Sequence, residues 1–112
     1  MIELVVFDMA GTTVYDDVNA VNASFRAALS EAGIDADPEF VKTVMGLHKP
    51  EAIRVLLDRY PRDGKPTTPE EIDAIHDDFV KRMRDFYLHS SEVREVPGAA
   101  ATFTRLRKAG IK

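Results

Sequence analysis

The 112-residue sequence contains no cysteine and no tryptophan. Without cysteine it can form no disulfide and can use no thiolate chemistry, which fits a cytoplasmic protein. No apolar run approaches the ~18 residues of a membrane span. No basic leader and no cleavage site precede the first apolar stretch, so we identify no signal peptide. We therefore expect a cytoplasmic protein without a membrane partner.

Positive charge is also limited. The chain has 15 lysine and arginine residues against 19 aspartate and glutamate residues, for a net charge of −4. The basic residues are dispersed among the acidic ones and form no basic patch, which argues against nucleic acid as a partner. The sequence is 45% hydrophobic, which is enough for the core of one domain.

Strand-like sequence is scarce as well. The run Ile2–Phe7 is short, mostly apolar and rich in β-branched residues, and it predicts a strand buried on both faces. Ile111–Lys112 predicts the start of a second strand. The rest has helical periodicity and helix-capping residues, so the chain itself is predicted to be mostly α. The predicted helices cover residues 18–32, 39–45, 50–60, 68–89 and 99–109. The polar residues 15–17 are candidates to cap the first helix, Gly33 to end it, and Pro38 to open the second. Residues 68–71 match the capping-box pattern at the start of the fourth helix.

The stretch that follows the first strand is the most informative. Asp8 lies at the carboxyl end of that strand, where open α/β sheets bind their ligands. Gly11 permits a tight turn, and Thr12 and Thr13 supply hydroxyl and backbone N–H groups for an anion. A carboxylate in this position suits a nucleophile or a metal ligand. The structural alternative is a turn in which Asp8 binds its own backbone.

The string Asp8-Met9-Ala10-Gly11-Thr12-Thr13-Val14 resembles motif I of the haloacid dehalogenase superfamily, and within it the phosphonoacetaldehyde hydrolase (phosphonatase) branch. Most phosphatases of the superfamily have a second aspartate where this chain has Ala10. The resemblance implies an α/β fold, namely the N-terminal part of a Rossmann-like core with an inserted α-helical cap. It assigns residues 1–16 and 93–112 to the core and residues 17–92 to the cap.

The same resemblance implies chemistry for the motif. Asp8 would attack phosphorus and form an aspartyl-phosphate, and Mg²⁺ would be held by Asp8 and the backbone carbonyl of Ala10. The methyl group of Ala10 cannot protonate a leaving alkoxide or activate water. The chain therefore needs a chemical substitute for the missing acid, unless Ala10 simply packs beneath the turn.

Lys49 is the candidate substitute. The string Met45-Gly46-Leu47-His48-Lys49 resembles the cap segment that carries the Schiff-base lysine of phosphonatases. By this resemblance Met45, Gly46 and His48 would contact substrate, although Met45 also suits a core position and Gly46 a helix break. The alternative for Lys49 is an exposed lysine before a helix. One departure is Ala52, which stands where phosphonatases typically have a histidine.

Two other histidines, His76 and His89, fall in the long predicted helix and are expected to be structural or exposed. By resemblance, three further motifs should follow residue 112: a serine or threonine, a phosphate-binding lysine or arginine, and an acidic pair. We therefore expect this chain to be the N-terminal part of a longer protein and to be inactive alone.

The sequence favours a magnesium-dependent, phosphonatase-like hydrolase that cleaves a C–P or P–O bond of a small phosphorylated or phosphonate substrate. One alternative is a small-metabolite phosphatase of the same superfamily. The other is a non-catalytic helical module that binds a partner or forms a homodimer through the unpaired strand Ile2–Phe7.

Overall fold

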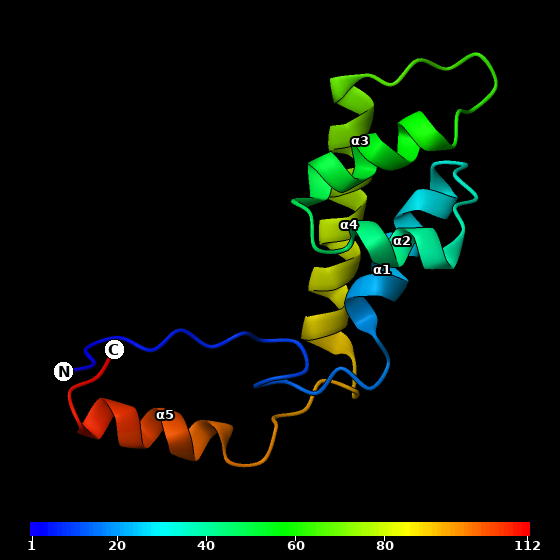
Figure 1. Cartoon of the computed structure of the whole chain (residues 1–112). Helices are drawn as coiled ribbons and strands as arrows, with labels where there is room; N and C mark the ends of the chain where they lie inside the picture. Colours follow the sequence, from blue (N-terminus) through cyan, green and yellow to red (C-terminus); the bar gives the residue numbers. More distant parts are fainter. The chain divides into compact units, whose positions relative to one another are not determined.

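The computed structural model describes all 112 residues and contains five helices. They fall into two compact units (Figure 1). The helical unit, Asn19–His89, holds α1 (Ala20–Glu31), α2 (Pro38–Val44), α3 (Lys49–Arg59) and α4 (Pro69–His89). The terminal unit, Met1–Val18 with Ser90–Lys112, holds α5 (Ala99–Lys108). No helix is both long and apolar enough to cross a bilayer.

The helical unit is built around α4. Helices α1 and α3 both pack against α4, and α2 packs against α1 and α3. The apolar residues recur at three- or four-residue spacing, so each helix turns one apolar face inward. The largest fully buried side chains come from α1, α2 and α3, and they are Phe25, Leu29, Val41, Ile53 and Leu56. Ile75 and Phe79 from α4 close this core.

Local sequence signals set several helix ends as predicted. Gly33 adopts a φ of 79° just after α1, a left-handed conformation that glycine accommodates without strain. Pro38 opens α2 at its first position. The hydroxyl of Thr68 accepts a hydrogen bond from the backbone N–H of Glu71 at 3.2 Å, which caps α4.

The predicted capping box at α4 is only half present. The carboxylate of Glu71 does not return to the helix start but pairs with Arg62 in the preceding loop. Arg62 also donates to the carbonyl of Ala32, the C-cap of α1, at 3.1 Å. The Glu71 carboxylate therefore binds Arg62, which lies outside α4, and not the backbone N–H at the start of its own helix.

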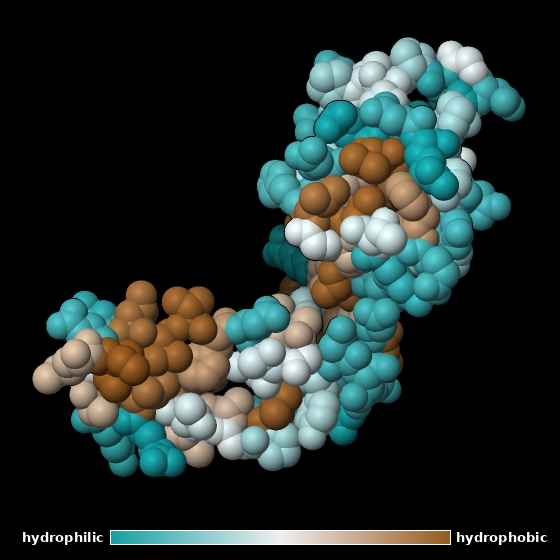
Figure 2. Space-filling model, in the orientation of Figure 1, coloured by the Kyte–Doolittle hydropathy of each residue, from teal (hydrophilic) through white to brown (hydrophobic).

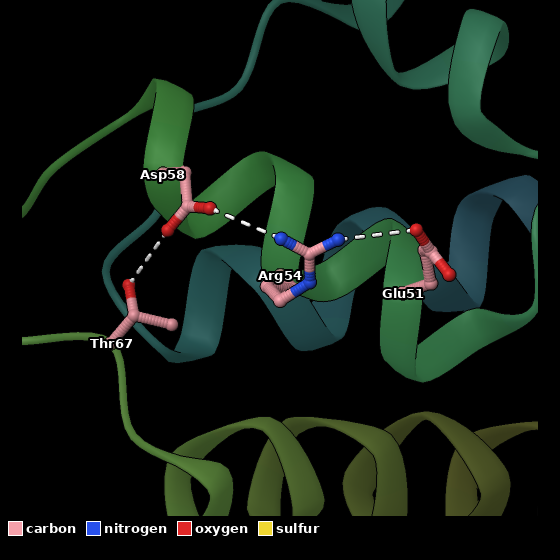
Figure 3. Close-up of polar contacts among 4 residues, drawn as sticks. All are labelled: Glu51, Arg54, Asp58 and Thr67. Carbon is pink, nitrogen blue, oxygen red and sulfur yellow. Dashed lines mark hydrogen bonds and ion pairs between the residues drawn. The ribbon is translucent and has the colours of Figure 1, made fainter.

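The outer face of α3 is polar (Figure 3). Arg54 pairs with Glu51 at 3.1 Å and with Asp58 at 3.7 Å, and Thr67 donates to Asp58 at 3.3 Å. The paired side chains are about half exposed, and exposed pairs of this kind add little to stability. The contact of Thr67 nevertheless ties the loop between α3 and α4 to α3.

In the terminal unit, the N-terminal segment runs beside the C-terminus. Val5 donates to the carbonyl of Lys112 at 2.8 Å, and Lys112 donates to the carbonyl of Glu3 at 3.0 Å. This alternation is that of a parallel pair. The pairing is limited to these two bonds, so neither residues 2–7 nor Ile111–Lys112 form a regular strand. The two strands that the sequence predicted are present only as this short parallel contact.

The prediction that the segment Ile2–Phe7 is buried on both faces is wrong for this chain. Phe7 packs edge-to-face on Phe103 of α5, with ring centroids 5.2 Å apart. The alternate side chains Ile2, Leu4 and Val6 are 68%, 62% and 83% exposed. Figure 2 shows the resulting hydrophobic surface over this segment. Nothing in these 112 residues covers that face of the segment.

The two linkers of the terminal unit are bonded to each other. Tyr15 donates its N–H to the carbonyl of Arg94 at 2.9 Å, and Arg94 pairs with Asp17 at 2.5 Å. The sequence predicted a cap for the first helix within residues 15–17, but the N-cap is Asn19, which makes no side-chain capping bond. The unit boundaries fall at 18/19 and 89/90, two or three residues from the boundaries predicted for core and cap.

Candidate active site

The loop after the N-terminal segment is a tight turn closed by its own backbone. The N–H groups of Thr12, Thr13 and Val14 all donate to the carbonyl of Met9, at 3.2, 3.0 and 3.0 Å. Gly11 donates to the carbonyl of Val14 at 2.8 Å and has a φ of 78°. This left-handed φ explains the glycine, because L side chains rarely adopt it.

Asp8 is exposed at the start of this loop. Its Oδ1 accepts the N–H of Met9 at 2.8 Å, while its backbone carbonyl accepts the hydroxyl of Thr13 at 3.1 Å. The carboxylate therefore does bind its own backbone, as the structural alternative proposed, but through one oxygen. The bond to Met9 fixes the carboxylate and leaves Oδ2 outside any hydrogen bond or ion pair of the chain.

The predicted anion-binding groups are used within the loop itself. The amides of Thr12 and Thr13 donate to Met9, and the Thr13 hydroxyl donates to Asp8. The hydroxyl of Thr12 makes no hydrogen bond within the chain. Of the two threonines, Thr12 is thus the one with a polar side chain available to a ligand.

The oxygen donors at this loop suit a hard cation. Asp8 supplies a carboxylate, and the backbone carbonyl of Ala10 takes no part in the bonds that close the turn. Oxygen donors of this kind are those that Mg²⁺ prefers. The set is partial, because nowhere in the chain do three or more His, Asp or Glu side chains gather as metal ligands.

The second group of predicted site residues lies in the short connection between α2 and α3. Met45 is the C-cap of α2, and the N–H of Leu47 donates to the carbonyl of Val44 at 3.1 Å. His48 is the N-cap of α3, and Lys49 is its first residue. The chain thus makes one compact bend that carries Met45, Gly46, His48 and Lys49.

Lys49 is not an ordinary exposed lysine. Its side chain is half-buried, and its Nζ donates to the carbonyl of Met45 at 2.7 Å and approaches the carbonyl of Leu47 at 3.4 Å. The same nitrogen lies 5.7 Å from the ring centroid of Phe25 in α1. Burial lowers the pKa of Lys49 from 10.5, because a desolvated ammonium is less stable than a hydrated one.

The other residues of the bend differ in exposure. Met45 is half-buried and packs against the core of the helical unit, while Gly46 and His48 are exposed. A Cβ on Gly46 would meet nothing within 4 Å, so no protein contact requires glycine there. Ala52, at the position of the histidine expected from phosphonatases, is fully buried among core residues.

The structure therefore gathers the predicted residues into two groups. Asp8, Ala10, Gly11, Thr12 and Thr13 share one loop of the terminal unit, and Met45, Gly46, His48 and Lys49 share one bend of the helical unit. Neither remaining histidine joins them: His76 lies 6.5 Å from the ring of Phe79, and His89 ends α4 exposed. Sequence reasoning missed Phe25, because its periodicity marks only a core position.

Comparison with curated proteins gives relatives along the whole chain. The phosphonoacetaldehyde hydrolase of Pseudomonas entomophila is 30% identical over 119 aligned positions, which cover 99% of this chain and 42% of that protein. The phosphonoacetaldehyde hydrolase of Bacillus mycoides is 31% identical, with 99% and 44% covered. The chain thus spans less than half the length of these relatives. No family model matches it.

Comparison with solved structures gives the fold. CbbY from Rhodobacter sphaeroides, solved in complex with phosphate, matches all of this chain and 49% of its own, with a TM-score of 0.73 and 23% identity. A predicted phosphoglycolate phosphatase from Haemophilus somnus matches 98% of this chain and 48% of its own, with a TM-score of 0.65 and 20% identity. The fold predicted from the sequence is confirmed by these two matches. The similarity along 99% of the chain confirms the resemblance first drawn from residues 8–14 and 45–49: this chain is similar in sequence to phosphonoacetaldehyde hydrolases.

Proposed function

We propose that this chain provides the nucleophile and the amine of a phosphonatase-like hydrolase that acts on a small phosphonate carrying an aldehyde. The observation that carries the proposal is the half-buried amine of Lys49, held by two carbonyls on a bend of the helical unit. It occurs in a chain whose motif has Ala10 in place of an acid. An amine that forms an imine removes the need for that acid.

In the first step, the neutral amine of Lys49 attacks the aldehyde carbon, water leaves, and a protonated imine remains. The carboxylate of Asp8 then attacks phosphorus. The C–P bond breaks, and its electron pair moves into the iminium to give an enamine. The enamine takes a proton at carbon and is hydrolysed to acetaldehyde and the free amine, while water cleaves the aspartyl-phosphate to phosphate and Asp8.

Each predicted site residue takes a role in this reaction. The bond from the N–H of Met9 to Oδ1 of Asp8 orients the carboxylate and leaves Oδ2 to attack. Thr12 offers its hydroxyl to a phosphoryl oxygen. Asp8 and the carbonyl of Ala10 would hold Mg²⁺, which when bound reduces the charge repulsion between a carboxylate and a phosphoryl group. Met45, Gly46 and His48 lie on the same bend as Lys49 and would line the substrate side.

A second candidate is a phosphatase for a small phosphorylated metabolite. It is favoured by the fold, which this chain shares with CbbY in complex with phosphate. In that function Lys49 would contact the substrate through charge alone. The missing acid at Ala10 counts against it, because a leaving alkoxide needs a proton donor.

The test measures phosphate release from phosphonoacetaldehyde and from simple phosphomonoesters, with protein expressed from its native reading frame. We expect release from the phosphonate. Asp8→Asn should lower it by about 10³-fold or more, since nucleophile replacements in other enzymes cost at least this much. Lys49→Arg should abolish it, because a guanidinium stays protonated and forms no imine. Lys42→Arg, at an exposed position of α2, is the matched control and should retain full activity.

Two results separate the candidate functions. Reduction with borohydride during turnover should leave N-ethyl-lysine at Lys49, which peptide mass mapping detects. Activity confined to phosphomonoesters, and retained by Lys49→Arg, would instead establish the phosphatase. Phosphate release from neither substrate would refute both.

A further inference from the structure

The amine of Lys49 lies between two kinds of electron-rich group, both within the helical unit. Two backbone carbonyls from the bend, those of Met45 and Leu47, accept its N–H groups at 2.7 and 3.4 Å. The ring of Phe25 lies 5.7 Å from Nζ. Carbonyl oxygens and aromatic ring faces both attract an ammonium group. These three partners therefore define one position for the amine.

The ring of Phe25 is a fixed partner. Phe25 is fully buried in α1. Its ring meets that of Phe79 from α4 edge-to-face, with centroids 5.5 Å apart and planes at 79°. A close-packed core holds such a ring in a single rotamer. The ring under Lys49 thus has its orientation set by α1 and α4 together, rather than by the bend that carries the lysine.

No acidic side chain of the neighbouring helices pairs with the amine of Lys49. Several pair with a basic residue of their own helix: Glu39 with Lys42, Glu51 with Arg54, and Asp78 with Arg82. The amine of Lys49 is instead held by neutral groups. Neutral partners orient an amine without adding the strong preference for the charged form that a carboxylate imposes.

We propose that Phe25 is a positioning residue for Lys49, whose ring face and the carbonyls of Met45 and Leu47 together fix the amine for attack on an aldehyde. This rests on the proposed function of Lys49 as an imine-forming amine. When the ammonium loses its proton, the attraction to the ring disappears and one N–H donor is lost. The neutral amine is then released toward the aldehyde carbon from a defined starting position.

The first measurement needs no variant. The ε-methylene protons of Lys49 should resonate upfield of those in a peptide of residues 45–53, because the adjoining Nζ lies over the ring of Phe25. NMR with lysine labelled in its side chain detects this in the chain as it stands. Resonances at the positions found in the peptide would overturn the proposal.

The second measurement compares two variants by titrating the Lys49 amine. Phe25→Leu keeps an apolar side chain but removes the ring, so the pKa of Lys49 should fall by about half a unit, the equivalent of one cation–π contact. Phe79→Leu is the matched control, because it alters the same ring pair without removing the ring beneath Lys49. We expect less than half the effect of Phe25→Leu from it.

Equal shifts in both variants would mean that Phe25 acts through packing alone, and the proposal would fail. The titration does not depend on turnover, so its outcome is distinct from that of the proposed function. Upfield resonances with no imine at Lys49 would refute the proposed chemistry and would leave the ring–amine contact as a structural one.

Discussion

At the scale of single residues, Lys49 combines burial with hydrogen bonds to neutral partners. Burial lowers its pKa, which increases the fraction of neutral amine at any pH in its titration range. A nucleophilic amine must be neutral, so the same desolvation that opposes the ammonium favours the reaction. The two carbonyls keep the side chain at one place on the bend.

The sign of the pH effect follows from this shift. In the unfolded chain the pKa of Lys49 is 10.5. In the folded chain its pKa is lower, so Lys49 releases its proton at a lower pH. Between the folded and unfolded pKa values the unfolded state binds more protons, so the contribution of Lys49 to stability rises with pH. Below the folded pKa, burial of the ammonium opposes folding.

We therefore predict that Lys49 reacts with an aldehyde and borohydride at a lower pH than the same lysine in an unfolded peptide. The extent of reductive alkylation at Lys49, followed by peptide mass mapping, should rise with pH through a midpoint below 10.5. The peptide of residues 45–53 provides the reference. Identical profiles in the chain and the peptide would show that burial does not affect the amine.

At the scale of elements, Arg62 joins three parts of the helical unit. It belongs to the loop between α3 and α4, donates to the carbonyl that ends α1, and pairs with Glu71 in the first turn of α4. The side chains of this pair are only 13% and 21% exposed. Oε2 of Glu71 is buried without a hydrogen-bond partner, so the carboxylate depends on Arg62.

Removing Arg62 should therefore be costly. Arg62→Ala leaves a largely buried carboxylate without its counter-charge, and we expect the free energy of unfolding to fall by about 2 kcal/mol or more. Arg54→Ala is the matched control, because it removes an arginine with a half-exposed side chain, and it should cost no more than about 0.5 kcal/mol. Urea unfolding followed by circular dichroism measures both variants. If both variants lost the same free energy of unfolding, the largely buried pair of Arg62 and Glu71 would contribute no more to stability than an exposed pair.

The sequence predicted the elements whose causes are local. The glycine after α1, the proline that opens α2 and the threonine that caps α4 act through neighbouring residues, and all three are found. Features with distant causes were missed. The partner of Glu71 in α4 is Arg62 of the preceding loop, and Asp17 pairs with Arg94 across 77 positions of sequence.

The candidate site divides in the same way. The turn at Gly11 follows from local chemistry, and the sequence predicted it. The surroundings of Lys49 depend on how α1 packs, and periodicity alone gives no reason to single out Phe25. The burial of Ile2–Phe7 was predicted wrongly. An apolar composition indicates that burial of a segment would be favourable, but the residues that bury it must come from elsewhere in the structure.

At the scale of the whole molecule, the two units differ in how much they bury. Every buried apolar side chain lies between Ala20 and Phe79, inside the helical unit. The terminal unit has contacts such as Phe7 with Phe103, but α5 buries none of its residues. Asp8 is thus carried by a unit without a closed core, and Lys49 by a unit with one.

This difference predicts that the helical unit folds by itself. Residues 19–89 made as a separate polypeptide should remain helical and unfold cooperatively, because their core contains no residue from outside that range. Circular dichroism during heating tests this. Ile53→Ala in the same polypeptide is the control. It removes a fully buried side chain, should lower the free energy of unfolding by about 3 kcal/mol, and should clearly lower the midpoint of the thermal transition.

In the intact chain, the amides of α1 and α4 should exchange their hydrogens far more slowly than those of residues 2–8. A gradual, non-cooperative transition for 19–89 would contradict the prediction and would show that the terminal unit contributes to the stability of the helical one.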